Sequence, residues 1–237
     1  MILVVLRSSL FAAFQLLLTP VFAVIALLTF RLPALTRYRI ITVWTRWVMW
    51  ASRVICGIRY RVVGAENIPK DPCIILAKHQ SAWETMGFQL IFPPQVWVLK
   101  KELLRVPFFG WGLAMLSPIA IDRSSRRQAL QQLVEQGQHR LVAGFFIVIF
   151  PEGTRIAPGK RGKYRAGGAR LAVQTKTPVL PVAHNAGLCW GKNAFLKYPG
   201  LVTVSIGPLI QPDGDAETLA RRVEDWIENE MQHLDAR

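Results

Sequence analysis

Residues 73–84, CIILAKHQSAWE, join a short apolar run to a polar segment that carries His79 and, five positions later, Glu84. The run Cys73–Ala77 is typical of a buried strand, and the residues from Trp83 onward have the pattern of a helix. A carboxylate that curls back over such a turn fixes the tautomer of an imidazole and stabilises its protonated form. On spacing alone two interpretations stay open: an oriented base, or a histidine that caps the helix or completes the loop.

From Gly57 onward, short apolar runs alternate with helical patterns. Strands are predicted at Ile58–Val63, Cys73–Ala77, Val96–Leu99, Pro118–Ile121, Phe145–Phe150, Val179–Ala183 and Leu201–Ile206. Helices are predicted at Trp83–Ile91, Phe108–Met115, Arg126–Val142 and Ala166–Thr175. This alternation predicts an α/β domain with a mainly parallel sheet of about seven strands flanked by helices.

Polar side chains directly follow four of these predicted strands. They are His79, Lys100 with Lys101, Asp122 with Arg123, and the run Glu152-Gly153-Thr154-Arg155. Because functional residues of parallel sheets gather at the carboxyl ends of the strands, we expect these clusters to form one site. Gly153 permits a sharp turn, and Arg155 offers a planar fork for phosphate oxygens. The basic residues of 160–165 either extend this anion site or form a solvated or lipid-facing patch.

The spacing of the motifs argues against several other chemistries. The segment after Arg155 is not a P-loop, because Pro158 stands where the second glycine of that motif belongs. No metal-ligand spacing is present, and we expect His139 and His184 to be structural or exposed. Ser81 lacks the glycines that flank a nucleophilic serine. A base beside phosphate-binding cations remains, which favours acyl transfer to a hydroxyl without a covalent enzyme intermediate.

The positive charge lies on the N-terminal part and the middle of the chain. The formal net charge of the 237 residues is +14, and residues 1–61 hold eight arginines and no acidic residue. Basic residues among long apolar runs favour an anionic membrane over nucleic acid as partner, and no nucleic-acid-binding motif is present. The three cysteines lie far apart among apolar neighbours, which predicts a reducing compartment without disulfides.

Two N-terminal segments predict a membrane anchor. Residues 10–30 carry no charge and are about long enough to cross a bilayer, with Pro20 as a point of kinking or division. Residues 35–56 predict a second helix with arginines every seven residues on one face and tryptophans elsewhere, as in an interfacial helix. Spanning and interfacial anchors both stay open, as does a core helix at 35–56. If residues 10–30 span the membrane, the arginines place the rest of the chain in the cytoplasm.

These patterns divide the chain into three parts. Residues 1–56 form the anchoring segment, residues 57–212 the α/β domain, and residues 213–237 a C-terminal part with an acidic amphipathic helix. Apolar residues on one side of that helix predict that it packs on the sheet.

Four blocks of the chain together resemble the glycerolipid acyltransferase family, most closely its bacterial members that acylate 1-acyl-sn-glycerol-3-phosphate. The blocks are KHQSAWE at 78–84, KEL and IDR within 101–123, FPEGTR at 150–155 and VLPV at 179–182. Their occurrence in this order, over roughly residues 57–207, is highly specific. One position departs, because the family's first block usually ends in aspartate and here ends in Glu84. The longer side chain keeps a carboxylate of similar pKa.

The resemblance implies a reaction and a set of site residues. His79 would act as general base, with Glu84 as the carboxylate that orients it. The phosphate-binding set would be Arg155, Lys101 and Arg123 with the turn residues Glu152, Gly153 and Thr154. Lysophosphatidic acid would accept an acyl group from acyl-CoA or acyl-carrier protein as co-substrate, giving phosphatidic acid. The family further implies no cofactor, no metal, contact with membrane lipids, and a bacterial inner membrane with the site facing the cytoplasm.

Two other functions stay open from the sequence. The first is an acyltransferase acting on another lysolipid, such as a lyso-ornithine lipid or lysophosphatidylglycerol, or on glycerol 3-phosphate. The second is a non-enzymatic membrane protein that binds anionic lipid. The second would need neither the His79–Glu84 pair nor Glu152 within the basic site, and the sequence has both.

Overall fold

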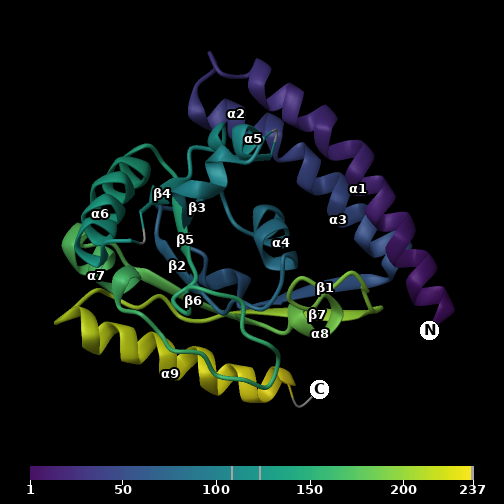
Figure 1. Cartoon of the computed structure of the whole chain (residues 1–237). Helices are drawn as coiled ribbons and strands as arrows, with labels where there is room; N and C mark the ends of the chain where they lie inside the picture. The colour runs from purple at the N-terminus through teal and green to yellow at the C-terminus, as the bar shows by residue number, and fades with distance from the viewer. Residues whose placement is uncertain (108, 123, 236–237) are drawn as a thin grey trace.

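A seven-stranded sheet forms the centre of the computed structural model, which describes residues 1–107, 109–122 and 124–235 (Figure 1). The strand order is β1-β7-β6-β2-β5-β3-β4. The strands are β1 (Ile58–Val63), β2 (Ile74–Ala77), β3 (Gln95–Lys100), β4 (Ile119–Ile121), β5 (Phe146–Ile149), β6 (Val179–His184) and β7 (Gly200–Ile206). Neighbouring strands are parallel except for β6 and β7, which are antiparallel. The prediction of a mainly parallel sheet of about seven strands is confirmed.

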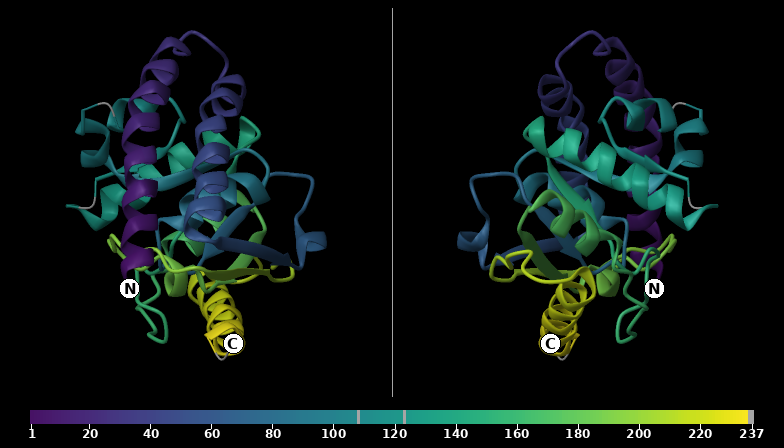
Figure 2. Two further views of the ribbon diagram at one scale, coloured as in Figure 1. Left: turned by 90° about the vertical axis from the view of Figure 1, so that its right-hand side faces the viewer. Right: turned by 90° about the vertical axis from the view of Figure 1, so that its left-hand side faces the viewer.

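Helices cover both faces of this sheet. They include α4 (Trp83–Ile91), α5 (Phe109–Ala114), α6 (Arg126–Val142), α7 (Gly167–Thr175), α8 (Ala186–Cys189) and α9 (Ala216–Asp235), with the short 3₁₀ turns η1 (Ala65–Asn67) and η2 (Lys101–Arg105). α7 packs against both α6 and α9, whereas α4 lies apart from them (Figures 1 and 2). The chain moves from β2 to β3 in one direction and from β5 to β6 in the other. Right-handed crossovers therefore place α4 and α7 on opposite faces.

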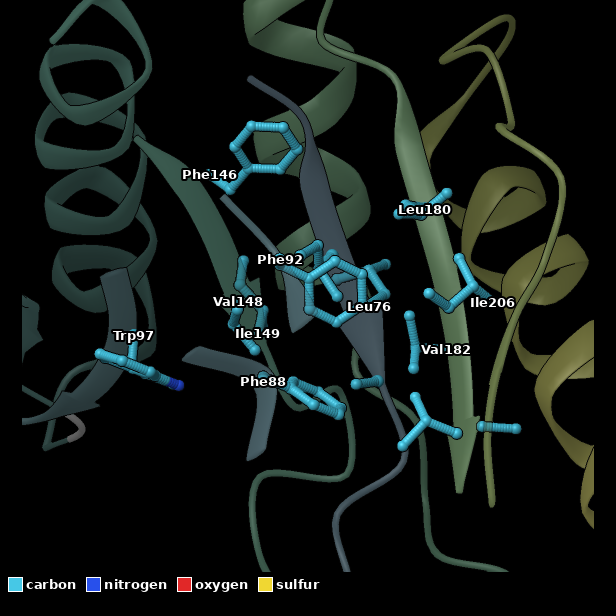
Figure 3. Close-up of a cluster of buried hydrophobic side chains, with 14 of the residues drawn as sticks. Leu76, Phe88, Phe92, Trp97, Phe146, Val148, Ile149, Leu180, Val182 and Ile206 are labelled. Atoms are coloured by element: carbon cyan, nitrogen blue, oxygen red, sulfur yellow. The ribbon is translucent and has the colours of Figure 1, made fainter. Parts of the chain in front are cut away.

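The core lies around the central strands, whose residues are buried on both faces. All residues of β2 and β5 are buried, as strands of a parallel sheet covered by helices require. Figure 3 shows Leu76, Val148 and Val182 from β2, β5 and β6 beside the rings of Phe88 and Phe92. These uninterrupted apolar runs explain why the strands were recognisable in the sequence.

The N-terminal part forms α1 (Ile2–Leu28), α2 (Ala34–Ile41) and α3 (Val43–Cys56). α1 continues through Pro20, and within the described residues it is the one helix long and apolar enough to cross a membrane. The prediction of one helix over residues 35–56 is wrong, because α2 ends at Ile41 and α3 begins at Val43. The carbonyl oxygen of Tyr38 accepts hydrogen bonds from both the N–H and the hydroxyl of Thr42, at 2.9 and 2.8 Å, and a side-chain bond of this kind often bends a helix.

The arginines predicted to share one face of that helix are consequently divided between two helices. Arg39 lies on α2, whereas Arg46 and Arg53 lie on α3, and all three are exposed. The opposite side of α3 buries Val48 and Met49, and α3 packs against α1, α4 and β1. α3 is therefore amphipathic, with one side contributing to the core of the domain.

Candidate active site

The predicted base and its carboxylate lie on the segment that joins β2 to α4. β2 ends at Ala77 and α4 begins at Trp83, so His79 lies in the turn between them. Nδ1 of His79 is 2.7 Å from Oε1 of Glu84 in the first turn of α4. The His79 ring also stacks on Phe150, with the ring centroids 3.9 Å apart. The fold thus brings His79 and Glu84 together as a dyad.

The His79 ring does not cap α4, whose N-cap residue is Ala82 and has no side-chain cap hydrogen bond. Oε1 of Glu84 accepts hydrogen bonds from the backbone N–H groups of Gln80 and Ser81, at 2.9 and 2.8 Å. The hydroxyl of Ser81 accepts one from the backbone N–H of Trp83 at 3.0 Å. Because these bonds satisfy free N–H groups around the start of α4, capping does not require the His79 ring.

Glu84 is fully buried and still favours its charged form. Burial alone would raise the pKa of this carboxyl group. The His79 side chain and the backbone N–H of Ser81 oppose that effect. The pKa of Glu84 consequently lies below its ordinary value. A carboxylate that accepts a hydrogen bond from Nδ1 of His79 leaves Nε2 as the nitrogen available to a substrate.

His184 lies behind Glu84 as a neutral ring. Its Nε2 is 2.8 Å from the carbonyl oxygen of Lys78, and its Nδ1 accepts a hydrogen bond from the N–H of Ala186 at 3.2 Å. A ring nitrogen that accepts a hydrogen bond carries no proton. Burial of this fully enclosed ring lowers its pKa in agreement with that geometry. His184 therefore has a structural role, connecting β6 to the turn after β2.

Glu152, predicted in the phosphate-binding set, is buried and holds the backbone of His79. Its Oε2 accepts a hydrogen bond from the N–H of His79 at 3.1 Å, and its Oε1 accepts one from Gly162 at 3.2 Å. Nζ of Lys78 lies 2.9 Å from the same Oε1 and 2.8 Å from Oε1 of Glu228 on α9. Two carboxylates thus compensate a nearly fully buried ammonium group.

Sequence reasoning missed Lys78 and Glu228. Lys78 gave a signal, because a charged residue directly after an apolar strand needs carboxylate partners if the fold buries it. Glu228 gave none, since it lies 150 residues away on an acidic helix. The hydroxyl of Tyr164 also donates to Glu228, at 2.7 Å, so the loop before α7 is fastened to the same carboxylate.

The turn after β5 presents Gly153, Thr154 and Arg155. Gly153 has a φ of +69°, a conformation that favours glycine. Nη1 of Arg155 donates to Oδ1 of Asn193 at 3.3 Å, and Nζ of Lys192 donates to the hydroxyl of Thr154 at 3.4 Å. Nε of Arg155 is buried and has no hydrogen-bond partner among the described residues. Arg155 therefore retains capacity to bind an anion.

His79 and Arg155 line the same cavity, which has a volume of about 1120 Å³. Its walls are mostly apolar and come from α1, α3, α4, β3 and α5, with Leu16, Met86 and Leu113 as examples. A cavity of this size and polarity fits a ligand with a long apolar part and a charged head. Among the described residues, no group of three or more His, Cys, Asp or Glu side chains is placed to hold a metal ion.

The basic residues of 160–165 divide between the two roles left open for them. Arg165 lines the cavity with Arg155, which adds a second guanidinium to the site. Arg161 instead pairs with Glu224 on α9, with Nη2 2.5 Å from Oε1. Lys160 is exposed.

Lys101, predicted as a phosphate ligand, is not among the residues that line the cavity. It forms an ion pair with Asp122, and the adjacent Lys100 is the lysine that lines the cavity. Arg123, the third predicted phosphate ligand, lies outside the described residues. The fold thus unites His79, Glu84 and the turn at Arg155, whereas Lys101 is held by a partner of its own.

The acyltransferase family model matches residues 59–185, more than half of the chain. The chain belongs to this family. The family resemblance predicted from the four sequence blocks is confirmed.

Individual relatives agree with the family assignment. The chain is 50% identical over 208 residues to a 1-acyl-sn-glycerol-3-phosphate acyltransferase of Pseudomonas aeruginosa, covering 86% of this chain and 81% of that protein. A protein of the same description from Borreliella burgdorferi is 31% identical over 187 residues, covering 76% and 74%. The crystal structure of the 1-acyl-sn-glycerophosphate (LPA) acyltransferase PlsC from Thermotoga maritima matches with a TM-score of 0.79. It covers 100% of this chain and 96% of that chain at 24% identity, which shows a shared fold.

Proposed function

We propose that this protein transfers a fatty acyl group from acyl-CoA or acyl-carrier protein to the sn-2 hydroxyl of 1-acyl-glycerol-3-phosphate, giving phosphatidic acid for phospholipid synthesis. One observation carries the proposal. A histidine with an oriented, buried carboxylate partner lines one large apolar cavity with an arginine whose Nε has no hydrogen-bond partner among the described residues. The named activity of the Pseudomonas and Borreliella relatives supports this choice of acceptor.

In the proposed mechanism His79 acts as general base. Nε2 removes the proton from the sn-2 hydroxyl as the oxygen attacks the thioester carbonyl. The tetrahedral intermediate collapses, the carbon–sulfur bond breaks, and the imidazolium returns the proton to the departing thiolate. Glu84 holds Nδ1 throughout and stabilises the imidazolium. General-base catalysis of this kind contributes roughly 10²–10⁴-fold to the rate.

Arg155 binds the acceptor phosphate in this proposal. Its planar guanidinium provides paired donors for phosphate oxygens, and fixing the phosphate positions the hydroxyl at His79. Gly153 and Thr154 shape the turn, and buried Glu152 keeps this turn attached to the base. Roles for Lys101 and Arg123 stay predictions, and for Lys101 the ion pair with Asp122 would have to open.

We further propose that the protein works at the cytoplasmic face of a bacterial inner membrane. α1 supplies the long apolar helix, and exposed Trp47 and Trp50 on α3 suit the interface of a bilayer. Exposed Arg46 and Arg53 on α3 add attraction to anionic lipid. An amphiphilic acceptor would then enter the cavity from the membrane, with its acyl chain against the walls from α1 and α3.

The test is an acyl-transfer assay on membranes that contain the protein. Labelled acyl-CoA and acyl-carrier protein are each supplied with a panel of acceptors: lysophosphatidic acid, lysophosphatidylglycerol, a lyso-ornithine lipid and glycerol 3-phosphate. We expect lysophosphatidic acid to give the largest specific rate above membranes lacking the protein. A larger rate with another acceptor would replace the proposed substrate, and no transfer to any acceptor would remove the enzymatic function.

A further inference from the structure

The loop between α8 and β7, residues 191–198, exposes aromatic side chains beside the first turns of α1. Phe195 is 52% exposed and Tyr198 is 43% exposed. The backbone N–H of Lys197 donates to the hydroxyl of Ser8 at 2.9 Å, which attaches the loop to α1. The outward side of α1 next to this point is apolar and exposed, for example at Leu6 and Leu10. The aromatic residues of the loop and the exposed apolar residues at the start of α1 therefore lie at the same end of the domain.

Lys197 fixes the shape of this loop from within. Its Nζ donates to the carbonyl oxygens of Ala194 and Phe195, at 3.0 and 2.8 Å. The same ammonium group lies 4.8 Å from the ring centroid of Trp190 and 5.7 Å from that of Phe195, and its side chain is nearly buried. Trp190 in turn packs edge-on against Phe11 of α1 at 5.3 Å. The loop is therefore already ordered with Phe195 exposed, so binding would cost little conformational entropy.

The opposite side of the loop contacts the anion-binding turn. Oδ1 of Asn193 accepts the hydrogen bond from Nη1 of Arg155, and Lys192 donates to the hydroxyl of Thr154. Asn193 has a φ of +52°, which is uncommon for a residue other than glycine and is maintained only where surroundings enforce it. One short loop therefore connects an exposed phenylalanine to the arginine that lines the cavity.

We propose that residues 191–198 insert Phe195 into the interface of an anionic bilayer and thereby set Arg155 at headgroup depth. Attachment to α1 through Ser8 and the positive charge of Lys192 in the same loop favour a lipid surface with anionic headgroups as the partner. The inference rests on the proposed function as a membrane enzyme, and it assigns a second contact with the bilayer far from α1 in sequence.

The test measures membrane depth without any acyl donor or acceptor. Phe195→Cys in the full-length protein is labelled with bimane, and the protein is reconstituted in vesicles of phosphatidylethanolamine and phosphatidylglycerol containing doxyl-labelled lipid. The native Cys56, Cys73 and Cys189 are buried, so the introduced thiol takes the label. Val63→Cys at the end of β1 is the matched control, because Val63 is 51% exposed.

We expect doxyl lipid to quench bimane at position 195 at least twofold more than at position 63, with weaker quenching when phosphatidylcholine replaces phosphatidylglycerol. Equal, weak quenching at both positions would overturn the proposal. A change in bimane emission at position 195 on adding an acidic carrier protein, without quenching by doxyl lipid in vesicles, would also overturn it in favour of a protein partner. Because the quenching experiment measures no reaction, it can be interpreted even if the acyltransferase assay fails.

Discussion

The carboxylate of Glu152 accepts a hydrogen bond from the backbone N–H of His79 at 3.1 Å, although the two residues are 73 positions apart. The turn that presents Arg155 is therefore attached to the residue that we propose as base. Displacing the buried Glu152 is therefore expected to disturb both the proposed base and the proposed phosphate site.

Gly162→Ala tests this attachment. A Cβ at position 162 would lie 2.7 Å from Oε1 of Glu152 and 2.8 Å from Cγ1 of Ile156, closer than such contacts occur, so the loop must shift against the Glu152 carboxylate that it contacts. We expect a loss of acyl transfer of roughly tenfold or more, since misplacing catalytic groups by about 1 Å costs up to ~10²-fold. Steady-state rates of the purified variant measure it.

Gly167→Ala is the matched control for that substitution. A Cβ there would meet Leu133 at 3.7 Å, an ordinary contact, at the start of α7. We expect wild-type activity within about twofold, because alanine suits a helix as well as or better than glycine. Equal activity losses in the two variants would contradict the role given to Glu152.

Glu84→Asp tests whether the site requires the longer side chain of glutamate. Oε1 of Glu84 serves the His79 ring and two backbone N–H groups at once, whereas its Oε2 is buried without a partner among the described residues. A side chain shorter by one methylene cannot keep all three bonds, so we expect kcat to fall by roughly tenfold or more. An unchanged kcat in the aspartate variant would show that the site accepts either glutamate or aspartate at position 84.

The buried neutral His184 predicts a loss of stability in acid. Burial lowers the pKa of His184. Below about pH 6.5, His184 is therefore protonated in the unfolded chain but stays neutral in the folded chain. Stability is therefore complete above that pH and falls as the pH drops. We expect His184→Gln to flatten the slope of unfolding free energy between about pH 6.5 and 5, by up to about 1.4 kcal/mol per pH unit. Denaturant titrations of the solubilised protein at several pH values measure it, and an unchanged slope would assign the acid sensitivity to other groups.

Arg155→Ala tests the phosphate assignment. We expect the rate with lysophosphatidic acid to fall roughly 10- to 100-fold, the worth of a hydrogen bond to a charged group. With monoacylglycerol, which lacks the phosphate, the loss should be much smaller. Arg161→Ala is the control, because Arg161 pairs with Glu224. Equal losses with both acceptors in Arg155→Ala would remove the phosphate contact.

The strands and the dyad were predictable because local patterns encode them. β2 and β5 are uninterrupted apolar runs, and His79 and Glu84 are close in sequence, so one turn brings them together. The position of the turn that carries Arg155, beside His79, followed from the rule that sites gather at the carboxyl ends of parallel strands.

Other features depend on contacts between distant segments and could not be predicted. Glu228 joins Lys78 only because α9 packs beside the loop at Tyr164. Lys101 carried the right charge for phosphate, but Asp122 on the neighbouring strand end holds it. The division of residues 35–56 falls at Thr42, whose hydroxyl bonds to Tyr38, and periodicity does not reveal it.

His79→Ala tests the central claim most directly. The measurement is kcat for acyl transfer to lysophosphatidic acid by purified protein whose unfolding transition matches that of wild type. We predict a loss of roughly 10²–10⁴-fold, as expected when a general base is removed. A variant that keeps more than about a tenth of the wild-type rate would contradict the role of His79 as the base.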